Sequence, residues 1–140
     1  MGDAEELRAR IEETRRQIQR DYRKTLEKVQ KLKNKMNELE QHTPKTQDLK
    51  ALDSAIKRLN RLTDSQIQRS KKAWIEYKKL EQECKQRALC PVQLDNLRAI
   101  CKKTEELAAD LLCYSLARFE QSERQSQKRA SNFSEAKYKS

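Results

Sequence analysis

The sequence predicts an all-α protein, an antiparallel three-helix bundle of long coiled-coil-like helices, and three observations lead to this prediction. The 140-residue chain contains one glycine and two prolines. Turns depend on Gly, Pro, Asn and Asp. The scarcity of glycine and proline therefore favours long uninterrupted helices. Apolar residues recur at helical spacing throughout most of the chain. The prolines divide the chain into three segments of similar length, and short connections between such helices favour antiparallel neighbours.

The first predicted helix covers about residues 4–41. Its apolar seam advances by steps of three and four residues, the pattern of a coiled coil, with one additional four-residue step near Ile18 and Tyr22. Such a stutter locally relaxes the left-handed supercoil. The seam consists of Leu7, Ile11, Thr14, Ile18, Tyr22, Thr25, Val29, Leu32, Met36 and Leu39.

The second predicted helix covers about residues 44–88, after a break at 41–48. Thr43 is a suitable N-cap, and Pro44 suits the first helical position, where its missing N–H costs nothing. Trp74 lies on the seam, where we interpret it as a packing anchor. The seam consists of Leu49, Leu52, Ile56, Leu59, Thr63, Ile67, Ser70, Trp74, Tyr77, Leu80, Cys84 and Ala88.

The third predicted helix covers about residues 91–124, and Pro91 is expected to start it. The apolar pattern fades after Phe119, so we expect a bundle over residues 1–124 and a polar, flexible, disordered tail over 125–140. The seam consists of Leu94, Leu97, Cys101, Thr104, Leu107, Leu111 and Tyr114.

A second apolar stripe runs beside the seam of the third helix, and it is formed by Ala109, Leu112, Leu116 and Phe119. Together the two stripes are wider than the single core-facing stripe of a surface helix. Either the third helix is deeply seated in an irregular bundle, or the stripe docks a helix of another chain, since a helix-in-groove contact uses the same spacing.

Positive charge is concentrated in the middle of the first two helices, on a chain of net charge +10. If the first turn lies near residue 43, position i of the first helix faces about position 86 − i of the second. The basic stretches 15–35 and 57–79 then largely coincide, and we call the result the basic belt. Its principal members are Arg15, Arg16, Arg20, Arg23, Lys24, Lys28, Lys57, Arg58, Arg61, Lys71 and Lys72.

The basic belt is compatible with several kinds of partner. It could contact an acidic protein surface such as a cytoskeletal filament, an anionic membrane, or nucleic acid. Sequence-specific nucleic-acid recognition is disfavoured because no zinc-finger, helix-turn-helix or RNA-binding signature is present. The chain has no apolar run long enough to span a bilayer and no secretory signal pattern, so we expect an intracellular, cytoplasmic protein.

No catalytic residues, metal ligands or cofactor-binding residues are predicted. The cysteine spacings do not match those of zinc sites, and the only histidine, His42, lies in the other predicted turn. Nucleophilic catalysis needs a base beside the nucleophile, and no second histidine exists. A glycine-rich phosphate loop is impossible with Gly2 as the only glycine. The sequence therefore favours a non-enzymatic protein without a cofactor.

All four cysteines fall in one region of the chain, between residues 84 and 113. Cys84 and Cys101 lie on seams, where free cysteine behaves as a small buried hydrophobe. Cys90 is at the break before the third helix, and Cys113 lies beside the second stripe. We predict three structural cysteines and one thiol, Cys113, that is exposed or at an interface.

The Trp-bearing, heptad-seamed, three-helix pattern is similar to spectrin-like repeats and other small coiled-coil modules. Spectrin-like repeats usually carry their tryptophan in the first helix, whereas Trp74 falls in the second, so no site is transferred. The function that the sequence favours is a non-enzymatic adaptor or scaffold subunit that binds protein through helix packing, by self-association or with another chain. The alternatives are peripheral binding to anionic membranes as a dimer and non-specific nucleic-acid binding.

Overall fold

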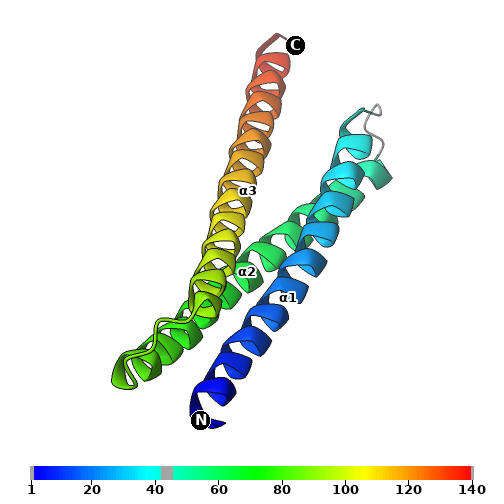
Figure 1. Cartoon of the computed structure of the whole chain (residues 1–140). Coiled ribbons are helices and arrows are strands. Elements are labelled where there is room, and N and C mark those ends of the chain that lie inside the picture. The colour runs from blue at the N-terminus through cyan, green and yellow to red at the C-terminus, as the bar shows by residue number, and fades with distance from the viewer. Residues whose placement is uncertain (1, 42–45, 140) are drawn as a thin grey trace.

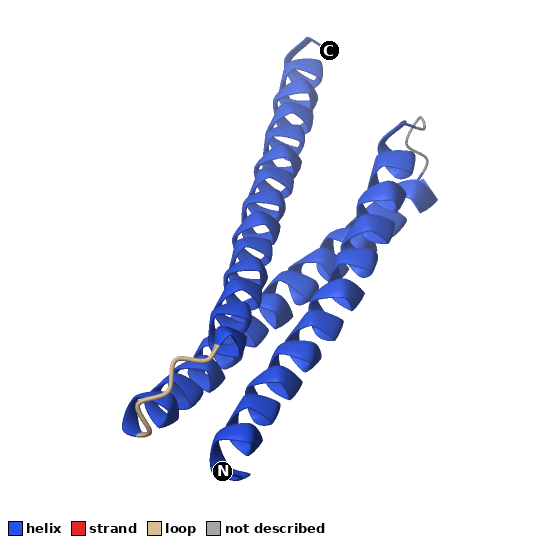
Figure 2. Cartoon of the chain, viewed as in Figure 1, coloured by secondary structure: helices blue, strands red, loops and turns tan. Residues whose placement is uncertain are grey.

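Three long helices make up the protein. The computed structural model describes the backbone of residues 2–41 and 46–139, and the side chains of residues 2–41, 49–118 and 120. The helices are α1 (Gly2–Gln41), α2 (Thr46–Gln86) and α3 (Val92–Lys139), and the described ranges contain no strand (Figure 2). All three helices pack against one another. The predicted three-helix bundle is therefore confirmed.

The chain runs along α1, returns along α2 and runs again in the first direction along α3 (Figure 1). Contacts between side chains set the register of the helices. Arg10 of α1 meets Glu83 of α2, and Ser115 of α3 donates a hydrogen bond to Asn60 of α2. The first pair joins an early position of α1 to a late position of α2. Between α2 and α3 the contacts move from Asn60–Ser115 to Gln66–Thr104 and Ala73–Cys101, so α3 numbers fall as α2 numbers rise. Helix α2 is therefore antiparallel to both neighbours, and α1 and α3 are parallel.

The apolar core is divided into two clusters along the rod. The first cluster lies near the α2–α3 connection and consists of Leu7, Ile11, Ala73, Tyr77, Leu80, Cys84, Leu97, Ile100 and Cys101. The second lies towards the other end and consists of Val29, Leu32, Met36, Ala55, Leu59, Leu107 and Leu111. Most of these positions belong to the predicted seams. Trp74 packs against the first cluster, with its ring edge-on to Tyr77 at 5.5 Å between centroids.

A buried polar layer separates the two clusters. Its members are Thr25, Thr63, Gln66, Ser70 and Thr104. The three threonine hydroxyls each donate to a backbone carbonyl four residues earlier in the same helix. Gln66 Nε2 donates to the carbonyl oxygen of Thr104 at 3.1 Å, which joins α2 to α3. The predicted seams include the three threonines and the serine of this layer, but not Gln66. The seam of the second helix places Ile67 in the core, whereas in the structure Ile67 is only half-buried and Gln66 is buried instead.

The end of α2 differs from the prediction, which placed Ala88 on the helical seam. Ala88 is instead exposed and has a φ of 53°. Leu89 N donates to Cys84 O at 2.8 Å and Ala88 N to Lys85 O at 3.2 Å. These are the two hydrogen bonds of a Schellman motif, with Ala88 in the left-handed position that glycine usually occupies. No glycine stands at this position to signal the end of the helix, so the predicted seam extends too far.

Both ends of α3 also differ from the expected bounds. The helix begins at Val92, so Pro91 is the residue before the first helical position rather than the first one itself. At the other end, Arg118 pairs with Glu40 beside the end of α1, and α3 then continues as helix to Lys139. Figure 1 shows this extension reaching beyond the other two helices. The backbone of residues 125–139 is therefore helical, and the flexibility predicted for the tail stays a prediction.

We expect Ala88→Gly to increase the free energy of unfolding by about 1 kcal/mol, because glycine adopts the left-handed conformation without the steric cost that a Cβ imposes. Urea denaturation followed by circular dichroism measures this change.

Ala99→Gly is the matched control, because Ala99 is exposed within α3. Glycine in a helix interior is destabilising by about 1 kcal/mol, so the two substitutions should have opposite signs. A loss of stability in Ala88→Gly would show that the end of α2 continues as helix in solution.

Candidate functional site

The second apolar stripe lies on the surface of α3. Leu112 is 44% exposed and Leu116 is 55% exposed, and Ala109 is exposed as well. The core-facing side of the same helix carries Leu107 and Leu111, which are buried. The alternative of a deeply seated third helix is therefore wrong for this stretch. The side chain of Phe119, the fourth predicted member, lies outside the described residues.

The basic belt also forms between α1 and α2, in a corrected register. Arg10 contacts Glu83 and Arg69 contacts Thr25, so position i faces about position 93 − i and not 86 − i. The difference arises because helical side chains lean towards the N-terminus of their own helix, which offsets contacts between antiparallel helices. With this register, residues 15–35 face about 58–78, which agrees with the two basic stretches more closely than the predicted register did.

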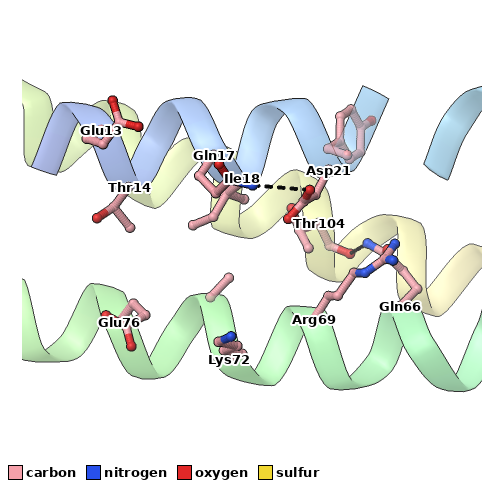
Figure 3. Close-up of a pocket in the computed structure, with 12 residues that line it drawn as sticks. Glu13, Thr14, Gln17, Ile18, Asp21, Gln66, Arg69, Lys72, Glu76 and Thr104 are labelled. Carbon is pink, nitrogen blue, oxygen red and sulfur yellow. Dashed lines mark hydrogen bonds between the residues drawn. The ribbon is translucent and has the colours of Figure 1, made fainter. Parts of the chain in front are cut away.

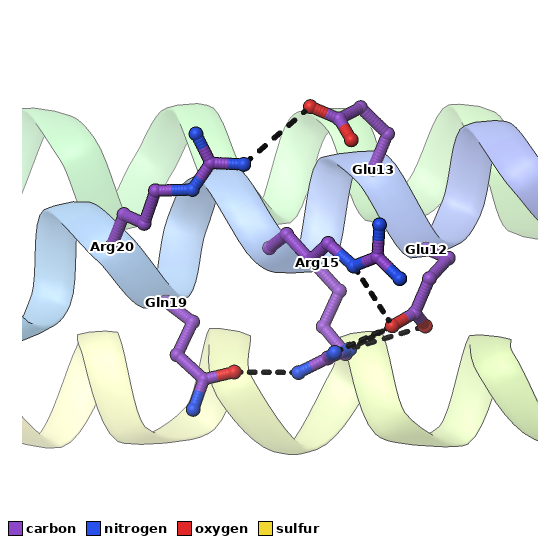
Figure 4. Close-up of polar contacts among 6 residues, drawn as sticks. Glu12, Glu13, Arg15, Gln19 and Arg20 are labelled. Carbon is purple, nitrogen blue, oxygen red and sulfur yellow. Dashed lines mark hydrogen bonds and ion pairs between the residues drawn. The ribbon is translucent and has the colours of Figure 1, made fainter.

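The belt is partly neutralised at the N-terminal end of α1 (Figure 4). Arg15 Nη2 lies 2.5 Å from Glu12 Oε1, and Arg16 Nε lies 3.6 Å from the same oxygen. Arg20 pairs with Glu13 at 3.8 Å. The hydrogen bond from Arg15 lowers the pKa of Glu12, and the guanidiniums of Arg15 and Arg16 lower it further. These arginines are therefore occupied within their own helix.

Most of the remaining belt presents its charge to solvent. Lys57 pairs with Asp53 at 3.1 Å, in an exposed contact. The other members are exposed, and no ion pair among the residues that the structure describes involves them. They are Arg23, Lys24, Lys28, Arg58, Arg61, Lys71 and Lys72. Among the described residues, the belt thus consists of ion pairs towards the N-terminus of α1 and mostly of unpaired cations elsewhere, with Lys57–Asp53 as the exception.

A cleft of about 490 Å³ opens between α1 and α2 at the level of the polar layer (Figure 3). The α1 wall includes Thr14, Ile18 and Tyr22, which are only half-buried. These are the positions of the stutter, where two consecutive four-residue steps move the seam away from the bundle axis. The cleft was not predicted from the sequence, although the stutter was the signal that could have located it.

The polar groups of the cleft are nearly all paired or exposed. Arg69 Nη1 crosses from α2 to donate to Thr25 Oγ1 at 2.7 Å, and Gln17 Nε2 donates to Asp21 Oδ1 at 3.4 Å. The exception is Gln66 Oε1, a buried acceptor with no hydrogen-bond partner. The lining contains both carboxylates and cations, but no nucleophile paired with a base. The geometry supports packing and hydrogen bonding and gives no catalytic arrangement among the described residues.

Metal binding and membrane spanning find no support in the part of the chain that the structure describes. No group of three or more His, Cys, Asp or Glu side chains lies close enough together there to hold an ion. None of the described helical segments combines the length and apolar character that crossing a bilayer would need. His42 lies outside the described residues.

The four cysteines divide into two buried and two exposed thiols. Cys84 and Cys101 are buried, as predicted, and Cys90 and Cys113 are exposed. Burial raises the pKa of Cys101 to about 11, and it also raises the pKa of Cys84. The prediction of a single exposed thiol was therefore incomplete, because the α2–α3 connection leaves Cys90 open to solvent.

No family model, curated protein or solved structure matches this chain.

We expect an aromatic disulfide reagent at pH 8 to modify two thiols per native chain rapidly. Cys90 and Cys113 are accessible, whereas Cys84 and Cys101 are buried with raised pKa values and therefore hold little of the reactive thiolate. The released chromophore gives the count, and denaturant should raise it to four. Rapid reaction of a Cys90→Ser, Cys113→Ser double variant would contradict the burial of the other two.

We expect Gln66→Met to leave stability unchanged or raise it by about 1 kcal/mol, because it removes a buried unpaired acceptor while keeping a similar volume. Urea denaturation measures the difference, and exposed Gln68→Met is the matched control. A loss of about 1 kcal/mol or more would instead show that the contact between Gln66 and Thr104 is a net source of stability.

Proposed function

We propose that this protein is a non-enzymatic adaptor or scaffold subunit that binds another protein through helix–helix contacts on α3. The observation that carries the proposal is the exposed apolar stripe of Ala109, Leu112 and Leu116. Isolated exposed leucines are common on protein surfaces. Here three apolar side chains follow one another at steps of three and four residues, which is the spacing with which a helix docks on a helix.

The stripe offers enough apolar area to contribute to an interface. Fully burying a leucine that was exposed contributes about 1.5–3 kcal/mol, and both Leu112 and Leu116 expose around half of their area. The two leucines would therefore act as the apolar centre of a larger contact. The helical extension of α3 beyond residue 120 continues the same helix and lengthens the surface available to a partner.

The charge of the chain favours a different, more acidic chain over a second copy as the partner. Two copies would each bring a net charge of +10, and like charges across an interface are unfavourable. An acidic helix would instead be attracted by the belt, which would steer its approach. Self-association through the stripe is the alternative that a mass measurement distinguishes.

Peripheral binding to anionic membranes is the second candidate function. The corrected register supports it, because it aligns the basic stretches of α1 and α2 and leaves most of their cations free. Polybasic surfaces bind anionic lipids with about 1 kcal/mol for each Lys or Arg near the membrane. This candidate uses the belt and not the stripe, so the two functions can be separated by substitution.

We expect Leu112→Glu with Leu116→Glu to abolish assembly while leaving the helical content and unfolding transition unchanged, because both side chains are exposed. A photo-crosslinker attached to Cys113, in a Cys90→Ser background, reports a neighbour of the stripe in cell extract. Light scattering of the purified protein separates a second copy from another chain.

The matched control is Ile75→Glu with Val92→Glu, which adds the same charge at two exposed aliphatic residues away from the stripe. The crosslinked product should survive in the control and disappear in the stripe variant. A monomeric protein without a stripe-dependent product would refute the adaptor proposal.

A further inference from the structure

A basic groove of about 310 Å³ lies between α1 and α2, towards the α1–α2 connection. We propose that this groove binds a ligand carrying two or more closely spaced phosphates. Its lining consists of Lys28, Lys31, Leu32, Lys35, Arg58 and Leu62. The inference stands apart from the docking stripe, which lies on α3.

The register of α1 and α2 brings the four cations together. Lys28, Lys31 and Lys35 recur at steps of three and four residues, so they share one face of α1. Arg58 of α2 lies across the groove from Lys35, at the position that the register of 93 − i requires. At 1.5 Å per residue, the three lysines extend over about 10 Å of the helix axis.

Apolar residues form the floor between these cations. Leu32 is buried and belongs to the second core cluster, and Leu62 packs against that cluster. Because both leucines are held by the core, the floor is fixed, while the lysine stems lie over it and keep their ammonium groups in water. The groove therefore combines an apolar base that is packed against the core with an exposed cationic rim.

The groove differs from the other cavities along the same seam because no carboxylate lines it. The mid-rod cleft is lined by Glu13, Asp21 and Glu76 besides its cations. A third cavity, near the N-terminus of α1, is lined by Glu13, Glu76 and Glu83 besides Arg10 and Lys79. Where carboxylates line the seam, they can neutralise the neighbouring cations, so an added anion would bind there with a less favourable free energy.

The four cations of the basic groove have no such partner among the described side chains. Their mutual repulsion is relieved when an anion binds, and the low-dielectric floor strengthens the attraction. Arg58 can bind a phosphate with two parallel hydrogen bonds, whereas each lysine acts as a point charge. A single phosphate cannot reach cations spread over two turns of helix, so the arrangement suits a polyphosphorylated ring or headgroup.

Two sources provide this chemistry, and the experiment separates them. Isothermal titration with inositol hexakisphosphate tests a soluble polyphosphate. Co-sedimentation with phosphatidylcholine vesicles, with and without a phosphatidylinositol bisphosphate, tests a lipid headgroup. The groove variant replaces Lys28, Lys31, Lys35 and Arg58 with glutamine, and the control variant replaces the exposed Lys71, Lys78, Lys102 and Lys103 with glutamine, so that both lose the same charge.

We expect one binding site per chain for inositol hexakisphosphate, with affinity reduced about tenfold or more in the groove variant and much less in the control. Vesicle binding that depends on the phosphoinositide and is competed by the soluble ligand identifies a lipid source. Binding of the soluble ligand alone identifies a free polyphosphate. An equal loss in the two variants, or no saturable binding, would overturn the proposal. Assembly through the stripe should persist in the groove variant, so the two proposals fail independently.

Discussion

Each helix of this protein buries one narrow apolar stripe against the other two helices. The rest of the structure depends on this packing. The two core clusters contain mainly aliphatic residues, placed at steps of three and four along α1, α2 and α3. A core this thin cannot enclose a large cavity, and outside it and the buried polar layer most side chains are at least partly exposed to solvent. Functional groups therefore have to lie on helix surfaces or in the grooves between helices, and the candidate surfaces are found there.

The core is interrupted once, at the polar layer around Gln66. A buried polar layer contributes less stability than a leucine layer, and in coiled coils it is known to fix register. Here it coincides with the stutter of α1, where Ile18 and Tyr22 turn partly away from the axis and the mid-rod cleft opens. The contact of Arg69 with Thr25 and that of Gln66 with Thr104 tie α2 to both neighbours at this level.

Two surfaces with different chemistry result from this arrangement. The stripe of α3 is apolar and regular, and it suits a helix of another chain. The α1–α2 seam is charged, with ion pairs towards the N-terminus of α1 and, among the described residues, mostly unpaired cations towards the α1–α2 connection. Because the surfaces lie on different helices, one protein could hold a partner helix and an anionic ligand together, as an adaptor located by a phosphate-bearing molecule would.

The sequence by itself determined the helices, their approximate ends and most of the buried positions, because period and punctuation are local properties. It also identified the α3 stripe and the basic stretches. The left-handed end of α2 at Ala88, the burial of Gln66, the exposure of Cys90 and the grouping of Lys28, Lys31, Lys35 and Arg58 required the tertiary structure. The burial of Gln66 and the grouping of the four cations depend on how far one helix is shifted along another, whereas Ala88 and Cys90 depend on the path that the chain takes between α2 and α3. That shift is set by side chains that interlock across helices, and such contacts join residues that are distant in the sequence.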